Sequence, residues 1–151
     1  MALWDRLKES AQAMQAQLEE RKNELRGGAF RDAGMAMCAL VAAADGVIDP
    51  AERRRVGYLI EHNEVLRNFP AEDLRSLFED WLDRLAADPE GTRAEALREI
   101  ARARKKPVEA RAVVQIGIVI GGADGHFDHV ERVVVRDACH VLDLPLHEFD
   151  L

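Results

Sequence analysis

Apolar residues recur at spacings of three, four and seven through most of the chain, which is the spacing of helices that bury one face. The first stripe predicts one amphipathic helix over residues 2–26, ended by Gly27-Gly28. Its apolar members are Trp4, Leu7, Ala11, Met14, Leu18 and Leu25. Residues 30–44 are rich in Ala, Met and Leu and almost uncharged, so we expect a second helix that is buried on most sides.

Capping signals predict where the following helices begin. Asp49, Pro50 and Glu52 suit the N-cap, the first and the third helical position, the pattern of a capping box. The helix that they start should run to about residue 62. Another helix begins at Pro70 and meets a turn at residues 88–91; its apolar stripe is Leu74, Leu77, Phe78, Trp81, Leu82 and Leu85. Further helices are expected over about residues 92–105, over 107–121 and after 128, with a short tail after Pro145.

An internal repeat decides the one ambiguous segment. Residues 113–120 are rich in Val and Ile and would favour a strand on propensity alone. A displacement of 79 residues, however, lays residues 44–53 onto 123–132 with six of ten positions identical. Both copies follow an apolar segment that closes on small residues and precede a helical stripe. The helical context of the first copy therefore predicts helix before the second copy as well, and no strand is expected.

Composition fits a single all-α domain over residues 1–151, a compact bundle of about seven helices. Its expected parts are the N-terminal helix of residues 1–26 and two similar helical subdomains, residues 30–105 and 107–151. The longest apolar run is too short for a membrane span, and no signal peptide is recognised, so we expect a cytoplasmic protein. The net charge of −7 argues against nucleic acid as a partner. Cys38 and Cys139 are expected to be buried free thiols.

The repeat carries the candidate chemistry. Each copy reads Asp-Gly-x-(Ile/Phe)-Asp-x-x-Glu, which matches the second half of an EF-hand calcium loop. The first half is missing, because apolar residues or Gly stand where its first acids would be. The candidate metal ligands are Asp45, Asp49, Glu52, Asp124, Asp128 and Glu131. All-oxygen ligands favour a hard divalent cation, with Ca²⁺ as the first choice and Mg²⁺ or Mn²⁺ as alternatives. The adjacent His126 and His129 are interpreted as incidental surface residues.

Helix capping is the alternative explanation of both motifs. Gly46 and Gly125 could be left-handed residues that end a helix, and the Asp and Glu that follow could cap the next helix. This explanation leaves Asp45 and Asp124 unexplained, because negative charge near a helix C-terminus is unfavourable. Arg53 and Arg132 could neutralise them in place of a metal.

These motifs resemble the TerB family, helical proteins of bacterial tellurite-resistance systems. The segments that carry the resemblance are residues 1–26, 35–49, 61–69, 106–110, 116–120, 124–131 and 145–151. The resemblance implies an all-helical fold of two subdomains, a metal-binding acidic surface at the six carboxylates, and a role in tellurite and chemical-stress resistance. It also implies other Ter proteins as partners, at the inner face of the membrane and without direct membrane insertion.

Three functions compete on this basis. The first is a non-enzymatic scaffold that binds a divalent cation at the paired motifs and interacts with other proteins. The second is a metal-free adaptor in which the motifs only cap helices. The third is a metal-dependent hydrolase, which has the least support, because the sequence contains none of the familiar nucleophile, nucleotide or zinc motifs.

Overall fold

Helices make up the regular structure throughout the described chain. The structure, a computed structural model, describes residues 2–123 and 127–149, with the backbone alone for residues 2–9. Its α-helices are α1 (Ala2–Glu20), α2 (Gly28–Ala42), α3 (Pro50–Glu61), α4 (Ala71–Ala87), α5 (Pro89–Ala101), α6 (Pro107–Gly121) and α7 (His129–Leu142). Short 3-10 turns are η1 (Lys22–Glu24), η2 (Leu66–Asn68), η3 (Arg102–Lys105) and η4 (Leu146–Phe149). The predicted all-α bundle of seven helices is confirmed for these residues; the relation between two subdomains stays a prediction.

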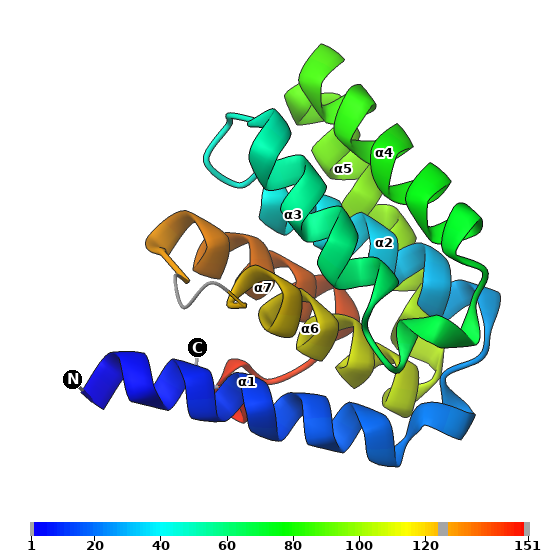
Figure 1. Ribbon diagram of the computed structural model, residues 1–151, viewed down its shortest axis with the longest axis vertical. Helices are drawn as coiled ribbons and strands as arrows, with labels where there is room; N and C mark the ends of the chain where they lie inside the picture. Colours follow the sequence, from blue (N-terminus) through cyan, green and yellow to red (C-terminus); the bar gives the residue numbers. More distant parts are fainter. Residues whose placement is uncertain (1, 124–126, 150–151) are drawn as a thin grey trace.

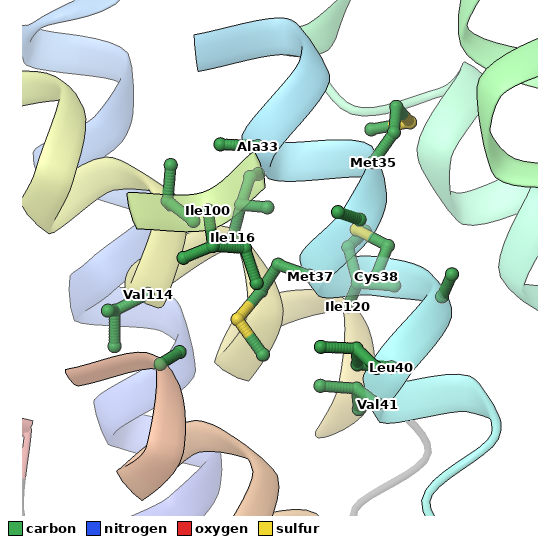
Figure 2. Close-up of a cluster of buried hydrophobic side chains, with 14 of the residues drawn as sticks. Ala33, Met35, Met37, Cys38, Leu40, Val41, Ile100, Val114, Ile116 and Ile120 are labelled. Carbon is green, nitrogen blue, oxygen red and sulfur yellow. The ribbon is translucent and has the colours of Figure 1, made fainter. Parts of the chain in front are cut away.

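Helix α2 is the centre of the bundle. It contacts α4, α5 and α6, and ten of its residues between Phe30 and Val41 are buried. Figure 2 shows part of this core, where Met37 of α2 lies among Ile100 of α5 and Ile116 of α6. The β-branched run of α6 is helical, as predicted: it packs against α1, α2 and α7, and this tertiary burial outweighs its strand propensity. No helix in the described residues is long and apolar enough to cross a lipid bilayer.

The N-terminal helix docks on the body of the protein. In Figure 1, α1 lies along one edge of the bundle beside α6, and the contacts between the two helices agree with that view. Met14 and Leu18 are buried, and two amide pairs hold the helix: Gln15 accepts from Asn63 at 3.0 Å, and Gln17 accepts from Gln115 at 2.8 Å. The side chains of Trp4 and Leu7 lie outside the described part.

Two predicted boundaries are wrong, and side-chain hydrogen bonds explain both. The first helix ends at Glu20 and continues as η1, where the Asn68 side chain donates to the carbonyl oxygens of Lys22 and Leu25 at 2.8 and 3.0 Å. These side-chain hydrogen bonds to the carbonyl oxygens take the place of the backbone hydrogen bonds of a continuing α-helix. Residues 88–91 are also not a turn between helices, because the Asp88 side chain accepts from the Gly91 backbone at 3.2 Å and caps α5 directly.

Candidate functional site

The two acidic motifs meet at one cavity. The loop between α2 and α3 and the segment that leads into α7 both line a hollow of about 340 Å³. Five of the six candidate carboxylates are among its lining residues: Asp45, Asp49, Glu52, Asp128 and Glu131. Asp124, Gly125 and His126 lie outside the described residues. The cavity therefore joins the first motif to the described part of the second.

The first corner is an Asx turn followed by a capped helix. Gly46 has a φ of 83°, the left-handed conformation that the helix-capping explanation requires of it. The Asp45 Oδ1 accepts from the Val47 backbone at 3.0 Å, and the Asp49 Oδ1 accepts from the Ala51 backbone at 2.7 Å. Asp49 is the N-cap, as predicted, but the predicted capping box is wrong: Asp49 accepts from the second helical residue and not from Glu52, and Glu52 pairs with the Arg55 guanidinium at 2.6 Å.

The second corner contains a complete capping box. The Asp128 Oδ1 accepts from the Glu131 backbone at 3.0 Å, and the Glu131 Oε1 accepts from the Asp128 backbone at 3.4 Å. Phe127 is buried beneath this corner and anchors it to the core. In both corners an Asp at the same position of the repeat caps the following helix. The Glu three residues later, however, has a different hydrogen-bond partner in each corner.

Helix α2 and helix α6 bring the corners together by packing closely near their C-terminal ends. A Cβ at Gly121, which lines the cavity, would lie 2.5 Å from Val41 Cγ1 and 3.3 Å from Glu131 Oε2. A Cβ at Gly117, one turn earlier, would lie 2.7 Å from Met37 Cγ. Glycine at both positions permits the close approach of the helices.

Arg53, one of the two residues that could neutralise the acidic corners in place of a metal, does not neutralise the first corner. Its guanidinium pairs with Glu79 and Asp83 of α4, the latter at 2.7 Å, and Asp45 forms no ion pair among the described residues. Arg132 likewise has no acidic partner in that part of the chain. Arg55 was not identified from the sequence as the cation that pairs with a motif carboxylate. Its position three residues after Glu52, on the same face of α3, would have indicated this pair.

The donor set favours hard cations, but it is not gathered around one point. Among the described residues, no three Asp, Glu, His or Cys side chains lie close enough together to share a metal ion. A carboxylate that caps a helix with one oxygen still has the second oxygen as an acceptor. His129 is exposed and does not line the cavity. The other described histidines, His62, His140 and His147, do not line it either. The cavity thus offers oxygen ligands and, in the described part, no nitrogen or sulfur ligands.

A comparison with known protein families shows to which family the chain belongs. The family model "Tellurite resistance protein TerB" matches residues 31–151. The chain belongs to the TerB family. It is therefore a helical protein associated with tellurite resistance, and the whole cavity lies in the matched region, whereas α1 and η1 precede it. No significant match was found among curated proteins or among solved structures.

Proposed function

We propose that this TerB-family protein binds a hard divalent cation, Ca²⁺ first of all, in the acidic cavity and acts as a non-enzymatic scaffold for other Ter proteins. Mg²⁺ and Mn²⁺ are the alternative ions. The observation that carries the proposal is the convergence of the motifs: carboxylates 79 residues apart in the chain line one hollow of about 340 Å³. We place this activity in the cytoplasm, with association to the inner face of the membrane through partners.

Electrostatics supports a cation in this place. Five carboxylates line the cavity, and Arg55 pairs with one of them, Glu52. Like charges that share a partly shielded surface repel one another, and a divalent cation relieves this repulsion directly. Asp45 is exposed just after α2, whose C-terminal end carries the negative end of the helix dipole. A cation there would relieve both the repulsion among the carboxylates and the repulsion between Asp45 and the dipole.

The residues can rearrange for ligation at modest expense in free energy. Asp49 and Asp128 each keep a free oxygen while capping their helices. Glu52 is about two-fifths exposed, and its pair with Arg55 is a partly exposed ion pair, which contributes at most about 1 kcal/mol. Release of Glu52 to an incoming ion is therefore feasible. When bound, the ion would cross-link the loop before α3 to the loop before α7.

The test is calorimetric titration of chelator-stripped protein with Ca²⁺, Mg²⁺, Mn²⁺ and Zn²⁺. The variant carries Asp45→Asn together with Asp124→Asn. Asn keeps the Asx-turn acceptor for Val47 and removes only the charge. The matched control carries Asp80→Asn with Asp143→Asn, which removes the same charge from exposed positions outside the cavity. We expect saturable binding of one cation that the cavity variant loses and the control retains.

Helix capping is the competing explanation, favoured by the complete capping box at Asp128 and Glu131. Failure of every ion to bind the intact protein would contradict the cation proposal and leave a metal-free adaptor. The non-enzymatic part has its own test, a generic phosphoester assay with saturating cation. Hydrolysis that scales with protein concentration and disappears in the cavity variant would overturn it and favour the hydrolase.

A further inference from the structure

A second hollow lies on the opposite flank of α3, between α3 and α4, and we name it the α3–α4 groove. It has a volume of about 240 Å³ and shares no lining residue with the acidic cavity. Ile60 and Phe78, each 1% exposed, form its apolar base. Tyr58 lines it while 61% exposed, and its ring stacks on His62 with centroids 3.9 Å apart. A large exposed aromatic residue beside an apolar hollow is typical of a protein-binding surface.

Gly57 is the second, independent observation. It lies in the interior of α3 and lines the groove. Glycine is less favourable than alanine in a helix interior, and glycines in such places usually serve close packing or a left-handed turn. Gly57 serves neither, because its φ is not positive and a Cβ built there would meet nothing within 4 Å. The fold therefore leaves this glycine unexplained, whereas a helix or side chain that approaches α3 from outside would use the space.

The charges along the groove select the kind of ligand. Arg53 is bound to Glu79 and Asp83, and these partners raise its pKa, with the Glu79 hydrogen bond as the largest cause. Arg75 is bound to Glu61 at 2.5 Å. Arg54 is then the one lining cation without an acidic partner among the described residues, and it is exposed. A ligand that reaches the groove meets an apolar base and one unsatisfied guanidinium.

We infer that the α3–α4 groove docks a segment of a partner protein that inserts an apolar side chain beside Gly57 and presents a carboxylate to Arg54. The aliphatic or aromatic side chain fills the hollow over Ile60 and Phe78. Tyr58 covers it from the side, and Tyr and Arg are the residue types that dominate binding energy at such interfaces. This inference does not depend on cation binding at the acidic cavity.

The probe is a short alanine-based helical peptide with one Phe and, one turn later, one Glu. A second peptide replaces that Glu by Lys. Binding is followed by amide ¹H–¹⁵N chemical shifts of the full chain. We expect the Glu peptide to shift resonances of residues 54–61 and 75–79 and to bind more tightly than the Lys peptide. Arg54→Gln should weaken the Glu peptide roughly two- to fivefold, as removal of one exposed ion pair does. Arg98→Gln, an exposed cation on α5 without an acidic partner in the described residues, is the matched control and should change nothing.

Gly57→Leu tests the groove without threatening the fold. The side chain enters open space and improves helix propensity, so the melting temperature should stay the same or rise. Binding of the Glu peptide should fall by about tenfold or more, because the hollow is filled. Retained binding in Gly57→Leu, or equal binding of both peptides, would overturn the inference. So would shifts of the same resonances on raising the protein concentration alone, since they would assign the groove to a second copy of the chain.

Discussion

Gly121→Ala is the substitution that tests how the two acidic corners are brought together. Gly121 is the last residue of α6 and touches both sides of the cavity. The new methyl group would lie 2.5 Å from Val41 Cγ1, 3.2 Å from Phe127 Cε2 and 3.3 Å from Glu131 Oε2. The first of these distances is well inside van der Waals contact, so α2 and α6 must separate or Val41 must move.

The expected loss can be worked from these contacts. Val41 is 5% exposed and β-branched, so it has little freedom to rotate away. Overpacking of a close-packed core costs about 1–3 kcal/mol. The gain in helix propensity from Gly to Ala is about 1 kcal/mol in a helix interior and smaller at the last helical residue. We therefore expect the free energy of unfolding to fall by about 1–2 kcal/mol, which for a chain of this size lowers Tm by roughly 3–6 °C.

Two other helical glycines are the controls for urea unfolding. Gly57→Ala places a methyl group in open space and should raise the free energy of unfolding by about 0.5–1 kcal/mol. Gly117→Ala meets the side chain of Met37 at 2.7 Å, but methionine is flexible and can give way, so its effect should lie between the other two. A Gly121→Ala protein as stable as the wild type would refute the close-packing argument, as would an equal response of all three sites.

Three further predictions concern the corners and the thiols. Asp128→Ala should lower the free energy of unfolding by about 1 kcal/mol through loss of the capping box, whereas Asp128→Asn should retain most of it; equal losses would contradict capping. Arg55→Gln should raise Ca²⁺ affinity by roughly fivefold in calorimetry, because it frees Glu52 from a partly exposed ion pair. Burial raises the pKa of Cys38 to about 12, and burial with the charge of Glu148 raises the pKa of Cys139 to about 11. Both thiols thus stay protonated at pH 8 and should react with a disulfide reagent far more slowly in native than in urea-unfolded protein.

The helices themselves were largely predictable from sequence. The period of apolar residues identified α4, and proline with an acidic neighbour identified the start of α3. Strand propensity would have failed for α6, and the internal repeat corrected it, since it supplied a second example of the same segment in a plainly helical context. Local signals of this kind succeed where the element is stabilised mainly by its own pattern of burial.

Boundaries and partners set by distant residues were not predictable. The end of α1 depends on Asn68, which is more than 40 residues away in the chain. Proximity in sequence makes Arg53 a possible partner of Asp45, but its partners come from α4, 26 and 30 residues later. The sequence also identified both acidic corners without showing that they share a cavity, because their meeting depends on how α2 crosses α6.

The two corners, although repeated in sequence, are not equivalent in the structure, and the difference has a consequence for ligand binding. Glu52 and Glu131 occupy the same position in the repeat, yet Glu52 is held by a side chain and Glu131 by the backbone of its own helix start. Drawing Glu131 toward an ion would break a capping box worth about 1 kcal/mol, whereas drawing Glu52 breaks a partly exposed ion pair worth less. We therefore expect the first corner to move when an ion binds and the second to stay fixed. Amide shifts on Ca²⁺ titration should then be larger for residues 52–55 than for residues 128–131, and the reverse order would contradict this division of roles.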